Sequence, residues 1–224
     1  MKKIYIIIVL VAISFTSCKT AAPIAKSVAY KGLYDEKPLS LLIMPPINKS
    51  VNVEAKEYFH STLYTPVANA GYYVIPPFLS MEILKKESAY DSEFFIDSPL
   101  NKFGEIFGVD MALFTIIHKW NKSSIASKVT VDVEYIIKST KTNEILYSRR
   151  GEVEYSTSVS TGNIYANILG SLISTAATKF VDVARDCNIY TFSDMPVGVY
   201  HPNNTVDGIE MAGLKSFKVR LKSK

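Results

Sequence analysis

The chain has 224 residues, of which 48% are hydrophobic and 21% are charged, fractions typical of a folded globular protein. Its formal net charge of +4 is too small to indicate nucleic-acid binding, and no basic run with interleaved aromatic residues is present. The chain has two cysteines, Cys18 and Cys187. If Cys18 carries a lipid, as its sequence context below predicts, Cys187 has no partner, so we expect no internal disulfide.

The first 18 residues, MKKIYIIIVLVAISFTSC, have the pattern of a secretory signal. Lys2 and Lys3 form a positive head, and the apolar run that follows is shorter than the roughly 20 residues that a membrane span needs. Small polar residues then lead to Cys18, which resembles the lipobox of bacterial lipoproteins, whose cysteine becomes the first mature residue and carries acyl chains. We predict a lipoprotein signal peptide at residues 1–17 and a lipid on Cys18. A plain secretory signal with an incidental Cys18 is the alternative.

Residues 18–38 show no clear hydrophobic period, so we expect a lipid-anchored tether there. The residue after Cys18 is Lys19 and not aspartate, the signal that retains lipoproteins in the inner membrane of some enteric bacteria. No acidic cluster of the surface-export kind follows it. We therefore expect a protein of the bacterial cell envelope, anchored in the outer membrane and facing the periplasm.

Residues 39–187 are expected to form one α/β domain. Its first part alternates short apolar runs, typical of strands buried on both faces, with segments of helical apolar spacing. Strands are expected at residues 39–44, 72–75 and 111–117, and helices at residues 53–70, 79–86 and 97–108. Pro66 predicts a break near Tyr64, and Ser98 and Pro99 predict the start of the third helix. This alternation indicates a parallel βαβ core with packed helices.

The pattern changes after Trp120. Residues 129–138 and 144–155 alternate in hydrophobicity around a polar turn, which predicts an antiparallel hairpin that extends the core into a mixed sheet. Residues 164–187 carry one apolar stripe, and the polar residues opposite it favour docking on the sheet over a membrane span. Residues 188–224 contain several Pro and Gly and end in a basic segment, so we expect a loop-rich carboxyl-terminal appendage.

Several separated motifs resemble those of a known family. They are Pro45-Pro46, Ser61-Thr62 with Pro66, Gly-Tyr-Tyr-Val at residues 71–74, and the segment SPLNKFGEIFGVDMALF. In these motifs residues 39–185 resemble a family of bacterial lipoproteins of unknown function. The resemblance implies a fold similar to the TolB amino-terminal domain and to the periplasmic domain of the curli-secretion lipoprotein CsgG. Relatives encoded beside CsgG-like proteins imply a role in outer-membrane assembly or export with a CsgG-like partner, and the family has no established catalytic residues.

The sequence shows no recognisable catalytic or metal site. His60, His118 and His201 lack the spacing of zinc ligands and lie away from the cysteines. Cys187 follows Asp186, whose negative charge raises the pKa of a neighbouring thiol. No phosphate-binding glycine loop and no Gly-x-Ser-x-Gly motif is present. We therefore expect no enzymatic activity, no metal and no cofactor.

The loop after the first strand is the better candidate for function. Ligands of open α/β sheets bind at the carboxyl ends of the strands, where Asn48, Lys49 and Ser50 lie. These residues form the predicted interaction loop, and capping of the next helix is their other possible role. The first hypothesis is a lipid-anchored accessory protein that binds other envelope proteins. The alternatives are a small-ligand-binding protein or enzyme with a cleft near Asn48, and an activator of peptidoglycan synthases, as one TolB-like lipoprotein family is.

Overall fold

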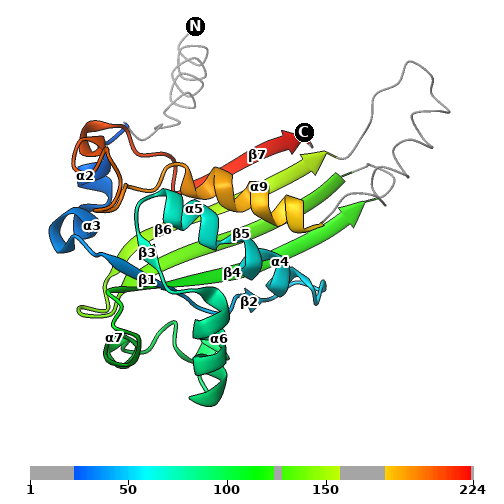
Figure 1. Ribbon diagram of the computed structural model, residues 1–224. Helices are drawn as coiled ribbons and strands as arrows, with labels where there is room; N and C mark the ends of the chain where they lie inside the picture. Colours follow the sequence, from blue (N-terminus) through cyan, green and yellow to red (C-terminus); the bar gives the residue numbers. More distant parts are fainter. Residues whose placement is uncertain (1–22, 124–127, 157–179, 223–224) are drawn as a thin grey trace, which may run out of the picture.

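A single mixed sheet organises the computed structural model, which describes residues 23–123, 128–156 and 180–222 (Figure 1). Its strands are β1 (Ser40–Ile43), β2 (Ile47–Asn48), β3 (Tyr73–Val74), β4 (Met111–Ser123), β5 (Lys128–Ser139), β6 (Ile145–Ser156) and β7 (Ser216–Lys222). Within the described residues the sheet has seven strands in the order β3-β1-β4-β5-β6-β7, and β2 also pairs with β4.

The sheet combines a parallel core with an antiparallel extension. β1 pairs in parallel with β3 and β4, and β2 pairs in parallel with β4. β4, β5 and β6 form an antiparallel meander, and β7 lies parallel to β6 at the edge of the sheet. The mixed α/β fold class predicted from the sequence is therefore confirmed.

Helices cover the core on both faces. They are α2 (Lys26–Ala29), α3 (Lys31–Glu36), α4 (Ala55–Thr62), α5 (Tyr64–Asn69), α6 (Pro77–Lys86), α7 (Asn101–Phe107) and α9 (Phe180–Phe192), with the 3-10 turns η1 (Ser92–Phe94) and η2 (Asp207–Ile209). Figure 1 shows α4, α5 and α9 lying side by side across the sheet. The division between α4 and α5 falls where Pro66 predicts a break.

Alternate residues of β1 enter two separate apolar clusters, because successive side chains of a strand point to opposite faces. Leu41 and Ile43 belong to the larger cluster with Phe59 of α4. Leu42 belongs to the smaller cluster with Phe103 of α7. A strand that is buried on both faces must be apolar throughout, which is why this segment reads as a continuous apolar run.

The tether expected at residues 18–38 includes two helices, α2 and α3, that belong to the domain. Tyr30 and Leu33 are buried in the larger cluster. The backbone N–H of Lys26 also donates to Glu210 O at 2.8 Å. Helices of four and six residues are too short to produce a recognisable period, so the sequence pattern did not reveal them.

The appendage expected at residues 188–224 also packs onto the domain. β7 completes the sheet, and α9 continues past Cys187. The Tyr72 hydroxyl donates to Pro196 O at 2.9 Å, which fixes the chain after α9 beside β3. This segment is rich in turns, as expected, but it is part of the same folded structure.

Only the last part of the helix expected at residues 164–187 can be compared with the structure, because residues 157–179 lie outside the described residues. α9 buries Val183, Cys187 and Asn188, and the Tyr135 hydroxyl of β5 donates to Asn188 Oδ1. This part of the helix therefore docks on the sheet, as predicted. In the three stretches that the structure describes, no helix has the length and apolar character needed to cross a membrane.

The helix expected at residues 97–108 begins later than predicted. α7 starts at Asn101, its N-cap position is Leu100, and no side chain caps it. The Ser98 hydroxyl instead donates to Phe94 O at 2.8 Å, within the turn that follows η1. The capping role predicted for Ser98 is therefore wrong, because its hydroxyl is engaged by the preceding turn.

Truncation of a core residue tests the burial of β4 in the smaller cluster. Phe114 is fully buried in the smaller cluster, so Phe114→Ala removes an aromatic ring and leaves a cavity. We expect the free energy of unfolding to fall by about 3–5 kcal/mol. Denaturant unfolding measures this loss. Phe94→Ala is the matched control, because Phe94 is 74% exposed; equal losses in the two variants would contradict the assignment.

Candidate functional site

The predicted lipidation residue, Cys18, lies outside the described residues, whereas the predicted interaction loop lies within them. The side chain of Asn48 closes this loop on itself. Its Nδ2 donates to Asn52 O at 2.7 Å. Its Oδ1 accepts from the backbone N–H of Ser50 at 3.0 Å and from the Ser50 hydroxyl at 2.7 Å. The polar groups that could contact a ligand are therefore used within the loop.

Lys49 joins the loop to the sheet through its backbone. Its N–H donates to Ile117 O at 2.9 Å, while its side chain is exposed. The N-cap position of α4 is Glu54, and no side chain caps that helix. Asn48 and Ser50 are thus not helix caps, because their side chains bond to the loop that precedes the helix.

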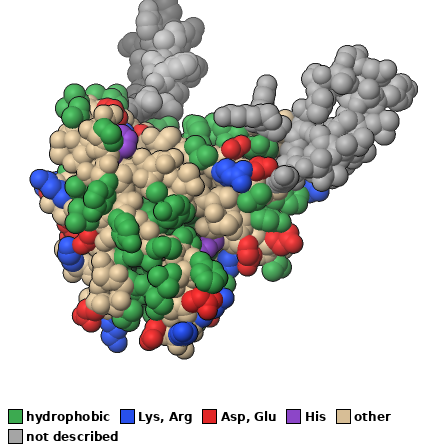
Figure 2. Space-filling model, in the orientation of Figure 1, with side chains coloured by type: hydrophobic (Ala, Val, Ile, Leu, Met, Phe, Trp, Pro, Cys, Tyr) green, Lys and Arg blue, Asp and Glu red, His purple; other side chains and the backbone are tan. Residues whose placement is uncertain are grey.

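Beside the charged Lys49 and Glu54, this region exposes large apolar side chains. Val51 and Val53 are 91% and 84% exposed, and both follow β2. Phe78, which follows β3 in the first turn of α6, is 82% exposed, and Phe94 of η1 is 74% exposed. We call these four side chains the apolar edge. Figure 2 shows hydrophobic side chains gathered on the lower part of the molecule, over the region of α6.

Contacts around η1 join it to the neighbouring elements. The Lys56 ammonium of α4 lies 4.2 Å from the centre of the Tyr90 ring, and that of Lys85 of α6 lies 5.8 Å from it. The buried Ser92 hydroxyl donates to Pro45 O at 2.6 Å. Since these partners come from α4, α6 and the end of β1, they fix η1 near these three elements.

The three histidines lie in different surroundings. His118 Nε2 is 2.8 Å from Glu134 Oε2. His60 Nε2 is buried without a hydrogen-bond partner, and burial lowers the pKa of this residue. His201 Nδ1 accepts from the backbone N–H of Asn203 at 3.1 Å. Within the part of the chain that the structure describes, no cluster of three or more His, Cys, Asp and Glu could hold a metal ion.

Cys187 is in a position unsuited to nucleophilic chemistry. Its side chain is fully buried in the larger cluster. Burial raises its pKa to about 12, so the thiol stays protonated at neutral pH.

Two hollows of the described surface lie away from the loop. One, of about 290 Å³, lies between α5 and the end of α9 and is lined by residues that include Pro66 and Phe192. The other, of about 610 Å³, lies beside β7 and is lined by residues that include Arg150 and Phe217. Neither supplies the cleft near Asn48 that a small-ligand site in this loop would need.

The predicted interaction loop differs from the structure in two ways: Asn48 ends the short strand β2, and the side chains of Asn48 and Ser50 bond to each other. The sequence pattern predicted that its polar side chains bind a partner, whereas the large apolar side chains of Val51 and Val53 face the solvent. Valine in a loop between two elements is a weak signal for exposure, because valine is usually buried. Phe78 directly follows Pro76-Pro77, and that double proline at the end of a strand is the signal that could have drawn attention to it.

Replacement of Asn48 tests how the loop is held. Asn48→Ala removes one donor and the acceptor of two hydrogen bonds. We expect faster amide hydrogen exchange at Ser50 and Asn52 and a loss of about 1–2 kcal/mol in stability. Lys49→Ala is the control, because its side chain is exposed. Unchanged exchange at Ser50 in the Asn48→Ala variant would show that the side chain does not hold the loop.

Comparison with known proteins places these features in context. Residues 28–196 match the family model described as "Putative lipoprotein GNA1162-like". The "Putative lipoprotein NMB1124/NMB1162" of Neisseria meningitidis serogroup B is 23% identical over 159 residues, which cover 70% of this chain and 72% of the relative. The crystal structure of lipoprotein GNA1162 from Neisseria meningitidis aligns with a TM-score of 0.50 and 21% identity, and covers 63% of this chain and 100% of that chain. The LpoB C-terminal domain from Salmonella enterica aligns with a TM-score of 0.38 and 16% identity, over 57% of this chain and 94% of that chain.

Proposed function

The chain belongs to the GNA1162-like lipoprotein family, and from this premise we propose that it is a lipid-anchored accessory protein of the bacterial envelope that binds other envelope proteins. The family match agrees with the resemblance that the Pro-Pro, Ser-Thr and Gly-Tyr-Tyr-Val motifs indicate. It begins within α2 and ends beyond α9, so it also covers helices that the sequence pattern had assigned to the tether.

The anchor in this proposal is a lipid on Cys18. The signal sequence before Cys18 and the lipoprotein names of the family and its relative support it. The proposed location is the outer membrane, with the domain facing the periplasm. Lys19, in the place of a retention aspartate, supports this location.

The apolar edge is the single observation that carries the binding role. Each of its four side chains is at least 74% exposed, which leaves large apolar groups in water at one edge of the sheet. We infer that they form one surface, because the contacts of Tyr90 and Ser92 with α4, α6 and the end of β1 join the segments that carry them. Exposed apolar surfaces of this kind are typical of protein-interaction sites. The contacts around η1 fix the segment that carries Phe94 before binding, which reduces the entropy lost on association.

The proposed partner is an envelope protein that offers an apolar groove, in outer-membrane assembly or export. A CsgG-like protein is the partner that the family resemblance implies. We propose no catalytic role. The burial of Cys187, the separation of the histidines and the internal bonding of Asn48 support a non-catalytic protein.

Substitution of the apolar edge tests this function. We expect the wild-type protein, crosslinked in membranes and then solubilised, to co-purify with specific envelope proteins. The double variant Val53→Ser with Phe78→Ser should lose these partners several-fold, because it removes apolar contact area without disturbing the core.

The matched control is Ile106→Ser with Ile145→Ser, since both residues are more than half exposed but lie elsewhere on the surface. Both double variants should unfold at nearly the same temperature as the wild type. Equal partner recovery from the two double variants, or no partner for the crosslinked wild type, would refute the proposed role of the apolar edge.

A further inference from the structure

A second group of exposed apolar side chains lies where α2 packs against η2. Ala25 and Met211 form an antiparallel bridge. The backbone N–H of Lys26 donates to Glu210 O at 2.8 Å beside it. The segments on either side of this bridge therefore lie side by side, at the end of the sheet where Figure 1 shows α2 and α3.

Large apolar side chains on these two segments face the solvent. We call them the α2–η2 patch, and they are Ile24 (49% exposed), Val28 (68%), Val206 (65%), Ile209 (81%) and Met211 (59%). The patch lies at the amino end of β1, because α2 and α3 lead directly into that strand. The apolar edge lies beyond the carboxyl ends of β2 and β3. The two apolar surfaces are thus at opposite ends of the parallel strands.

The charged side chains of the two segments are either buried or paired. Within residues 24–28 and 206–211 the charged residues are Lys26, Asp207 and Glu210. Lys26 is buried and forms an ion pair with Glu210 at 2.8 Å. Asp207 is buried and accepts from the backbone N–H of Val197 at 2.9 Å. Of the charged groups in these two segments, only the Glu210 carboxylate is exposed, and it is paired with Lys26.

The patch is close in the chain to the proposed anchor. Five peptide units join Cys18 to Pro23, the first described residue. Whatever their arrangement, a chain of this length spans at most roughly 18 Å. A lipid on Cys18 therefore keeps this end of the domain near the bilayer surface.

We propose that the α2–η2 patch lies in the interfacial layer of the membrane that holds the lipid of Cys18. This inference rests on the proposed anchor. Apolar side chains of such a surface enter the headgroup boundary by about 5–10 Å and add to the binding free energy of the acyl chains. With two attachments, the domain cannot turn freely about its tether. The apolar edge, at the opposite end of the parallel strands, then points away from the lipid and toward envelope proteins.

Fluorescence quenching by lipids tests this placement. The lipidated protein with Ile209→Cys, labelled with an environment-sensitive fluorophore, is placed in vesicles of phosphatidylethanolamine and phosphatidylglycerol that carry spin-labelled acyl chains. Cys187 is fully buried and stays unlabelled. The matched control carries the label at Val51→Cys in the apolar edge. We expect the label at position 209 to lose most of its fluorescence and the label at position 51 to keep it.

Each other outcome would overturn the placement. Equal quenching at the two positions, in protein that floats with the vesicles, refutes the patch contact and leaves the anchor intact. Protein that does not float refutes the anchor, and the patch contact with it. A spectral shift at position 209 that grows with protein concentration, without quenching by the lipid, would assign the patch to contact with a second copy of the chain.

Discussion

Met111–Ile117, the first half of β4, is buried on both faces of the sheet, and this double burial determines where the helices must lie. Asp110, directly before it, fixes its alignment with β1. The Asp110 carboxylate accepts from Leu39 N at 2.9 Å, from the Ser40 hydroxyl at 3.1 Å and from Lys141 Nζ at 2.7 Å. Burial disfavours its charged form, but the hydrogen bonds from Lys141 and Leu39 outweigh this and lower its pKa. The carboxylate therefore ties β1, β4 and the β5–β6 turn together at neutral pH.

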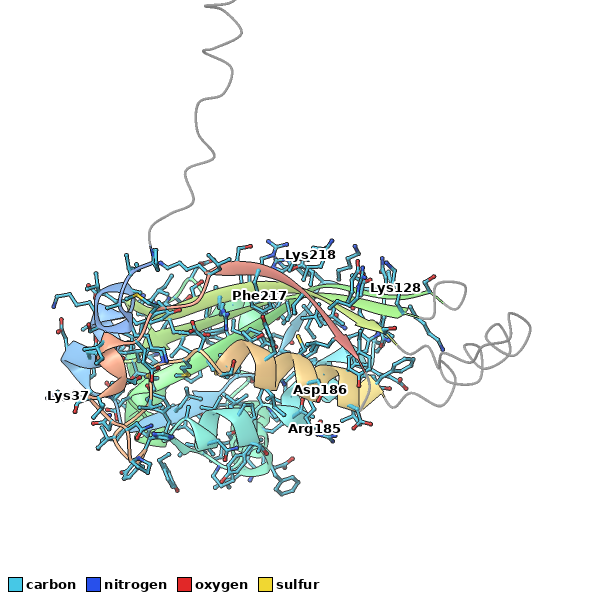
Figure 3. The ribbon with its side chains drawn as sticks, turned by 90° about the horizontal axis from the view of Figure 1, so that it is seen from above. Lys37, Lys128, Arg185, Asp186, Phe217 and Lys218 are labelled. Carbon is cyan, nitrogen blue, oxygen red and sulfur yellow. The ribbon has the colours of Figure 1, made fainter. Side chains whose placement is uncertain are left out.

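The second half of the meander has one buried face, which explains its alternating sequence. Its other face carries charged side chains in pairs, including Asp132 with Arg150 at 2.7 Å and Glu152 with Lys218 at 2.5 Å. Figure 3 shows Lys218 on the side of the sheet away from α9, the helix that carries Arg185. Exposed pairs of this kind contribute little to stability, about 0–1 kcal/mol each. Charged side chains of this kind are suited to a face in contact with water.

The core strands and the hairpin could be predicted because their periods extend over enough residues to be recognised. α2 and α3 could not, since they are too short to show a period and only tertiary contacts bury Tyr30 and Leu33. The sequence predicted a basic tail where the structure has β7. Phe217 and Val219 alternate there with charged residues, which is the pattern of a strand with one buried face. The interaction loop was expected to begin at Asn48, but the two-residue strand β2 (Ile47–Asn48) ends there, and a strand of that length has no recognisable period. The exposed residues of the loop could not be identified, because the inward hydrogen bonds of short polar side chains depend on the folded backbone.

Three parts lie in order along the molecule: the proposed lipid on Cys18, the α2–η2 patch beside it, and the apolar edge at the far end of the parallel strands. The anchor is the part on which the others depend, since it gives the patch a membrane and the edge an orientation. Mass spectrometry of the mature amino terminus, on protein isolated from membranes, tests it most directly. We expect Cys18 to be the first residue of the mature chain and to carry acyl chains. The Cys18→Ala variant should remain an uncleaved or soluble precursor. An unmodified residue at a different cleavage site would contradict the proposed anchor.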